Sequence, residues 1–186
     1  TATSKTNDLG LVTIQDGNNP NSGIFVTAGV GDGIDQWNRG DSVVINSCVV
    51  RENFNVTTLF SAGGSNHIVA GTGKTLPAFV SSLNSDSVHA KVAAQTEPYE
   101  GMLVQFDSVY VINQNADAPS NFGEFAIGKD SSKTVGLRVD DQSNDIGANF
   151  NLDSLTSKQK LAFLKGVLYF SFGNWKMLPR NRDDIA

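Results

Sequence analysis

The 186-residue chain contains few of the residues on which disulfide-bonded proteins and metalloenzymes depend. Its single cysteine, Cys48, excludes an intramolecular disulfide and lies in an apolar run, where a small buried side chain is expected. Its two histidines, His67 and His89, belong to no zinc or nucleophile motif. The sequence therefore gives no support for metal-dependent hydrolysis or nucleophilic catalysis, and we expect the chain not to be an enzyme.

Long apolar runs and an excess of positive charge are also lacking. No stretch approaches the roughly 20 apolar residues of a transmembrane helix, so no membrane insertion is expected. Fourteen Lys and Arg face 19 Asp and Glu, and the net charge of −5 argues against a general polyanion binder. Frequent Asn, Ser, Thr and Asp with few Lys are compatible with a secreted or cell-surface bacterial protein.

The residues that are abundant predict an all-β fold. Val, Ile, Thr and Phe favour strands, and 18 glycines with many Asn and Asp favour turns. In the second half, five apolar stretches predict strands, and Ser154 is a plausible N-cap for a short helix over residues 155–161. The resulting order, β-β-β-α-β-β, is that of a five-stranded OB barrel. The predicted strands cover residues 102–112, 122–127, 134–139, 163–172 and 175–178.

The first half predicts a similar barrel that is incomplete. Strands are expected over 9–15, 24–27, 41–51 and 56–61, but none before Leu9, because residues 1–8 are polar and expected to be mobile. We therefore predict two tandem OB-like five-stranded barrels, residues 1–95 and 96–186, the first lacking its first strand and the second carrying one short helix. The open edge left by the missing strand would be an association site.

A short segment near the middle of the chain joins the two predicted barrels. Tyr99, Glu100 and Gly101 lie at the entrance of a strong strand. Glu97 and Glu100 form a carboxylate pair that could do acid–base work. A carboxylate beside a glycine at a strand entrance more often accepts backbone N–H bonds, so a structural junction is the favoured interpretation.

Several motifs occur in an order that resembles a known family: Gln15-Asp16-Gly17, Ser22-Gly23-Ile24-Phe25-Val26, Gly40-Asp41-Ser42-Val43-Val44-Ile45, Tyr99-Glu100-Gly101-Met102-Leu103-Val104 and Gly173-Asn174-Trp175-Lys176 with Pro179-Arg180-Asn181. The resemblance is to the OB-fold accessory region of large secreted bacterial endonucleases and related surface proteins, where it precedes an endonuclease/exonuclease/phosphatase-type domain. It implies an accessory module, and it carries over no catalytic residue. That family usually has a strand before the first motif, so we expect this chain to be part of a longer protein.

A basic and aromatic stretch over residues 158–182 suggests single-stranded nucleic acid as a ligand, because OB barrels bind single strands with aromatic platforms in a basic groove. The candidate residues are Tyr169, Trp175, Lys176 and Arg180. The alternative is structural: alternation would place Phe163, Phe170 and Phe172 in the core, and the lysines would solvate a helix.

Oxygen-rich loops make a structural Ca²⁺ the one cofactor considered, with Asp140, Asp141 and Asp145 as its ligands. Calcium needs many oxygen ligands, no EF-hand pattern is present, and Asp and Asn are also ordinary turn residues.

Taken together, the sequence predicts a non-catalytic interaction, assembly or spacer module of a secreted or surface-associated bacterial protein. Its expected partners are other domains of a larger polypeptide, or neighbouring copies that pair through an open strand edge. The alternative is a single-stranded nucleic-acid-binding lobe of a secreted nuclease.

Overall fold

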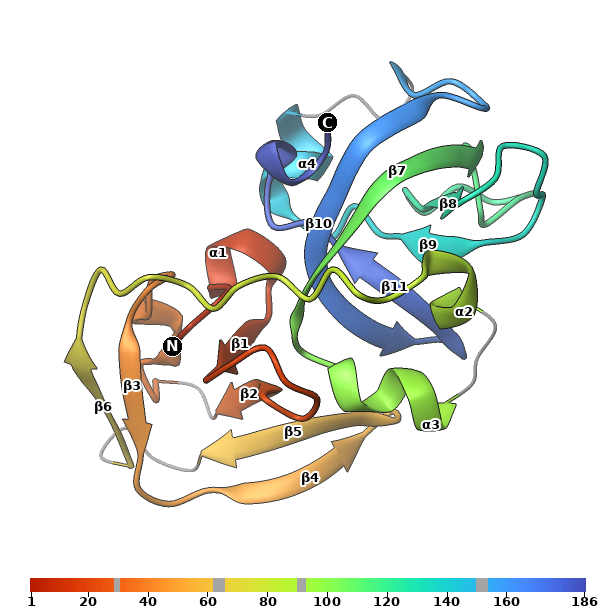
Figure 1. Ribbon diagram of the computed structural model, residues 1–186. Coiled ribbons are helices and arrows are strands. Elements are labelled where there is room, and N and C mark those ends of the chain that lie inside the picture. The colour runs from red at the N-terminus through yellow and green to blue at the C-terminus, as the bar shows by residue number, and fades with distance from the viewer. Residues whose placement is uncertain (29–30, 62–65, 90–92, 150–153) are drawn as a thin grey trace.

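The computed structural model describes residues 1–28, 31–61, 66–89, 93–149 and 154–186. Most of the regular structure is β, as the composition predicts. The second half of the chain forms a closed five-stranded barrel, and the described residues of the first half form open sheets. In Figure 1 the barrel lies at the upper right and the open sheets at the lower left, with α1 between them.

The barrel closes through a single parallel strand pair. Its wall follows the order β7-β8-β9-β11-β10, in which β9 and β11 are parallel and the other neighbours are antiparallel. A helix, α4 (Asn144–Asn149), separates the third and fourth strands. The predicted closed barrel and its β-β-β-α-β-β order are therefore confirmed. The strands are β7 (Leu103–Asn113), β8 (Phe125–Gly128), β9 (Leu137–Val139), β10 (Lys160–Ser171) and β11 (Asn174–Leu178).

The position of the helix differs from the prediction. Residues 155–161 are not helical: Lys158 has a φ of +69°, and β10 begins at Lys160. The observed helix, α4, contains the weak helix formers Asn and Gly, but its Ile146 is buried in the barrel core. Burial of one apolar side chain against the barrel thus outweighs intrinsic helix propensity here.

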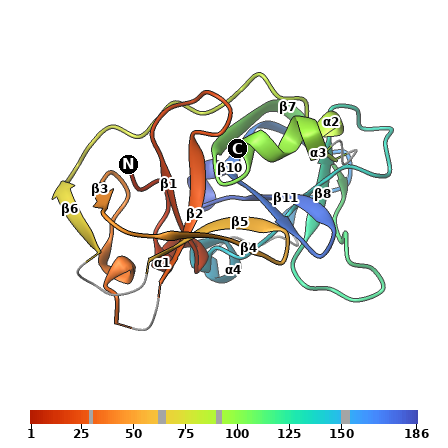
Figure 2. The ribbon, with the colours of Figure 1, turned by 90° about the horizontal axis from the view of Figure 1, so that it is seen from below.

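The first half forms two separate open sheets instead of the predicted barrel. Four strands pair in the order β1-β2-β5-β4, and β3 pairs only with β6. The two sheets share a small core around Trp37, which is buried with Val12 and Val26. Figure 2 shows β3 and β6 beside the larger sheet. The strands are β1 (Val12–Gln15), β2 (Gly23–Ala28), β3 (Ser42–Ile45), β4 (Val49–Asn53), β5 (Val56–Ser61) and β6 (His67–Gly71).

The N-terminal residues, predicted to be mobile, cover the outer edge of β1. Ala2 bridges Ile14, and the Thr3 N–H donates to the Thr13 carbonyl. Thr3 and Ser4 are polar yet fully buried, because their hydroxyls bond the Thr13 hydroxyl at 2.7 and 2.9 Å. A buried polar group is tolerated when its hydrogen bonds are made. The prediction of an uncovered edge at this strand was therefore wrong.

The remaining short elements connect or flank the sheets. Between β6 and α2 the chain crosses to the barrel, where Val80 bridges Val104 of β7 and Val88 joins the barrel core. The barrel core thus draws on residues that precede position 96. These elements are α1 (Thr6–Leu9), the 3-10 helix η1 (Ile34–Gln36), α2 (Ser85–His89), α3 (Ala93–Thr96), η2 (Glu97–Tyr99) and η4 (Arg182–Asp184).

The two halves share a buried joint. Leu9, Phe25 and Val56 pack in one cluster with barrel residues that include Leu103 and Val167. The side chain of a buried glutamine completes this contact, because Gln15 Oε1 accepts the Leu103 N–H at 2.9 Å. The joint is therefore a third buried cluster, distinct from the barrel core and from the cluster around Trp37.

Two glycines allow the backbones of the halves to approach at this joint. Gly101 has a φ of +72°, and a Cβ atom there would lie 3.0 Å from the Cα of Ile24. Gly23 faces it, because a Cβ at that position would lie 2.8 Å from the Gly101 carbonyl oxygen. Larger residues at either position would push the halves apart.

Gly101→Ala is predicted to destabilise the chain more than Gly73→Ala. Gly73 also has a positive φ, +63°, but a Cβ there would meet nothing within 4 Å. Both variants pay a left-handed backbone cost of about 1–2 kcal/mol, and only Gly101→Ala adds the contact with Ile24. Urea unfolding measures the difference, and equal losses of unfolding free energy would contradict the tight joint.

Candidate functional site

Glu100, predicted to be a junction residue, lies in the joint and binds the other half of the chain. Its Oε2 accepts the Thr57 N–H of β5 at 2.9 Å, whereas its buried Oε1 has no hydrogen-bond partner. Burial raises the pKa of Glu100 to about 7. The hydrogen bond from Thr57 lowers this pKa, whereas the nearby charges of Glu97 and Glu52 raise it further. Tyr99 packs against the barrel core. These contacts are those of a carboxyl group with a structural role.

The raised pKa of Glu100 predicts a loss of stability as pH rises. The unfolded chain ionises this group near its ordinary pKa of 4.5, whereas the folded chain retains the proton to about 7. Folding is therefore disfavoured progressively between these values. Glu100→Gln keeps an oxygen acceptor for Thr57 and carries no charge, so it should match the wild type near pH 4.5 and be more stable above pH 7. Urea midpoints at both pH values test this, and a difference that does not change with pH would contradict it.

Three of the four predicted nucleic-acid contacts are buried. Trp175 is 3% exposed and packs edge-on against Phe170 in the barrel core. Lys176 is buried and binds Glu124 and Asp140. The structure therefore does not present the basic and aromatic groove that the sequence suggested.

The remaining two members of that set contact other side chains of the protein. Arg180 is buried and binds both oxygens of Asp184, at 2.8 and 2.9 Å. Tyr169 is half-buried and contacts Phe25 edge-on, with 5.3 Å between ring centroids. Of the two aromatic candidates, Tyr169 lines surface hollows, whereas Trp175 lies in the core.

The three predicted calcium ligands are not brought together. Asp140 binds Lys176 at 3.1 Å, Asp141 lies against Gly123, and Asp145 accepts the backbone N–H of Arg182 at 2.9 Å. In the part of the chain that the structure describes, no group of three or more His, Cys, Asp or Glu side chains is placed to hold a metal ion. The predicted calcium set is therefore not assembled.

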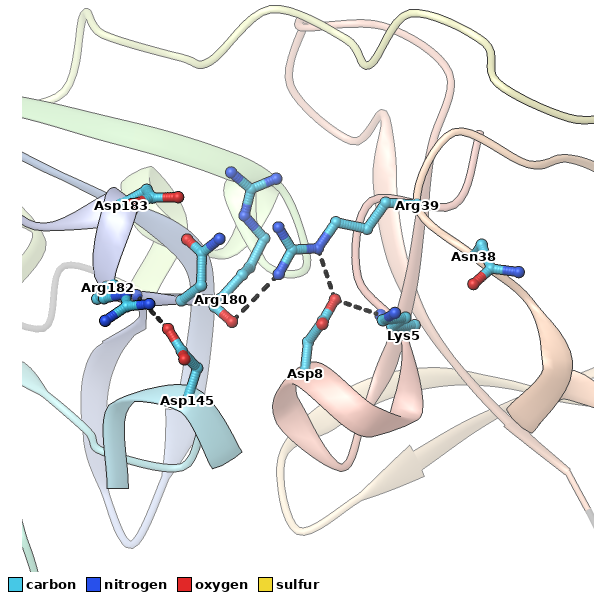
Figure 3. A pocket seen from close by; sticks show the side chains of 9 residues that line it. Lys5, Asp8, Asn38, Arg39, Asp145, Arg180, Arg182 and Asp183 are labelled. Carbon is cyan, nitrogen blue, oxygen red and sulfur yellow. Dashed lines mark hydrogen bonds and ion pairs between the residues drawn. The ribbon is translucent and has the colours of Figure 1, made fainter. Parts of the chain in front are cut away.

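A polar hollow of about 540 Å³ lies where α1 meets the C-terminal residues. Figure 3 shows Arg39 of the first half reaching both Asp8 and the backbone of Arg180. The distances are 2.5 Å from Arg39 Nε to Asp8 Oδ2 and 3.1 Å from Arg39 Nη2 to the Arg180 carbonyl oxygen. Carboxylates and cations alternate along the hollow, so its charges largely neutralise one another, and we assign it a role in holding the halves together.

A second hollow, the barrel-face cleft, has a different lining. It measures about 680 Å³ and lies over β9, β11 and the end of β10. Charged groups line it together with three aromatic rings, so it offers both polar and apolar contacts. The lining residues are Asp117, Phe122, Glu124, Arg138, Asp140, Gln142, Tyr169, Ser171, Phe172, Asn174 and Lys176.

The charged groups of the cleft form one network. Arg138 Nη1 binds Asp117 and Glu124, each at 2.7 Å, and Lys176 binds Glu124 and Asp140. Burial alone would lower the pKa of the Lys176 ammonium, but its bonds to the two carboxylates outweigh burial and raise that pKa. Three carboxylates thus surround two cations, and the network carries a net charge of −1.

Two cleft residues were missed by the sequence analysis. Phe172, which alternation placed in the core, is 96% exposed at the two-residue turn between β10 and β11. Phe122 is 74% exposed in the loop before β8. The only signal for Phe172 was the adjacent glycine, which is typical of the second position of such a turn. Cys48, expected to be buried, is exposed as well.

Comparison with known proteins found no match to this chain. No protein-family model matches the sequence, and no curated protein or solved structure matches the chain. The resemblance to endonuclease accessory regions therefore stays a prediction. Among the described helices, none has the length and apolar character of a membrane span.

Proposed function

We propose that the chain is a non-catalytic interaction module of a secreted or surface-associated bacterial protein, and that it pairs with a second copy of itself through β4. The observation that carries this proposal is the exposure of all five β4 residues. Val49 and Val50 are 55% and 65% exposed. Within the described ranges β4 pairs only with β5, so its other edge is free to accept a strand.

The sequence of β4 is complementary to itself in one antiparallel register. A two-fold axis normal to the sheet keeps each side chain on its own face, so a residue can lie opposite its own copy but not opposite its chain neighbour. Like charges that face each other across strands are destabilising, which disfavours a contact centred on Arg51 or on Glu52. With Val50 opposite Val50 of the second copy, Val49 faces Arg51 and no like charges meet.

Both charged side chains are already held at the strand. The Arg51 guanidinium lies 3.7 Å from the centroid of the Phe60 ring. Glu52 accepts a hydrogen bond from the Thr57 hydroxyl at 3.1 Å. Pairing would therefore cost less side-chain entropy than it would for two extended, freely rotating side chains.

The alternative function, a single-stranded nucleic-acid-binding lobe, requires an accessible basic and aromatic surface. Lys176 and Arg180 are buried against carboxylates, and Trp175 lies in the core. The geometry therefore favours the assembly module. The secreted or surface location rests on composition and on the family resemblance.

Charge substitution at Val50 tests the assembly proposal. Val50→Lys and Val50→Glu should each abolish the dimer, because each places two like charges directly opposite each other at the centre of the contact. An equimolar mixture of the two variants should restore a dimer, since a lysine of one chain then faces a glutamate of the other. Sedimentation velocity over a concentration series measures the association.

Lys160→Glu serves as the matched control, because it reverses an exposed charge on a barrel strand and should leave association unchanged. A wild-type chain that stays monomeric at high concentration would overturn the proposal. So would single variants that still associate like the wild type.

A further inference from the structure

Three exposed phenylalanines lie along two adjoining hollows. Phe54 and Phe172 occupy the tips of the β4–β5 and β10–β11 hairpins and line an apolar hollow of about 440 Å³ together with Tyr169. Tyr169 and Phe172 also line the barrel-face cleft, which Phe122 borders. The exposed fractions are 88% for Phe54, 96% for Phe172 and 74% for Phe122. We call Phe54, Phe122, Tyr169 and Phe172 the aromatic strip.

Stability alone does not explain the tip residues of the strip. Phe172 and Phe54 have φ values of +47° and +52°, in the left-handed region that Asn and Gly occupy more easily. Each ring is also exposed, so it gains none of the free energy that burial of a Phe side chain normally contributes. Backbone strain at an exposed aromatic residue points to a role outside the fold.

The floor of the cleft supplies fixed hydrogen-bonding groups. Arg138 is held by Asp117 and Glu124, and its Nη2 also donates to the Ala116 carbonyl at 2.9 Å. Asp117 Oδ2 is buried and has no hydrogen-bond partner. Donors and acceptors thus lie together in one polar network beside the rings.

We propose that the aromatic strip and the barrel-face cleft bind a neutral oligosaccharide chain. Sugar rings present apolar C–H faces that pack on aromatic rings, and their hydroxyls need donors and acceptors together. The net negative charge of the cleft network disfavours a polyphosphate chain, which would otherwise use the same stacking rings. The two hollows, of about 440 and 680 Å³, share Tyr169 and Phe172 in their linings and together give room for a chain of several units in preference to a single sugar.

Affinity electrophoresis tests this proposal on the intact chain. Native gels containing mixed-linkage β-glucan, xylan, galactomannan or soluble starch should retard the wild-type protein in at least one case. Phe172→Asn and Phe122→Ala should each weaken that binding by about tenfold or more. Val135→Ala removes a different exposed apolar side chain, at 63% exposure, and should leave binding unchanged.

Phe172→Asn also separates function from folding. Asn-Gly is a favoured pair for a two-residue hairpin turn, so this variant should unfold at the same temperature as the wild type or higher while losing binding. No retardation by any of the four polysaccharides would overturn the proposal, as would retardation that both Phe variants retain. Binding of a labelled oligo-dT in place of the neutral chains would overturn it in favour of nucleic acid.

Discussion

The close approach of two backbones at Gly23 and Gly101 is the constraint on which the arrangement of the molecule depends. It lets the start of β2 lie directly against the strand entrance of the barrel. Around it, Gln15 accepts the Leu103 N–H and Glu100 accepts the Thr57 N–H, so each half satisfies a backbone group of the other. A buried apolar cluster that includes Val56 and Leu103 lies beside these bonds. The joint is therefore specific, and it fixes how the open sheets sit on the barrel.

This placement decides which surfaces remain for partners. The β1 edge is closed by the N-terminal residues and the joint buries the face around Phe25, so β4 stays at the outside with all its residues exposed. The tip of the same hairpin comes beside the tip of the β10–β11 hairpin, and Phe54 and Phe172 line one hollow. The exposed edge of β4 and the aromatic strip are separate consequences of one packing arrangement.

The barrel could be predicted from sequence because its signal is local. Apolar alternation along β7 and β10 identifies strands, and the order of elements limits the topology. The buried cations could not be predicted in the same way. Lys176 and Arg180 look like surface charges in sequence. The barrel brings the distant Glu124 to Lys176, whereas Arg180 pairs with Asp184 four residues along the chain, where η4 turns the backbone back.

The predictions for the N-terminal residues and for Phe172 were wrong for related reasons. Thr3 and Ser4 are polar, and their burial depends on Thr13, which the sequence does not identify as a partner. Phe172 continues an alternating apolar pattern, but the turn reverses the chain at that residue and turns the ring to solvent. The barrel was predictable, whereas the cleft and the joint depend on long-range pairs.

Hydrogen exchange at the Leu103 amide tests the central claim that both halves form one cooperative unit. This N–H bonds to Gln15 across the joint, whereas the Leu168 N–H bonds to Met102 within the barrel half. If the joint opens only when the whole chain unfolds, both amides exchange with the same opening free energy, as expected for one cooperative unit. Fast exchange at Leu103 with Leu168 still protected would contradict the account, because the halves would then separate while the barrel stays folded.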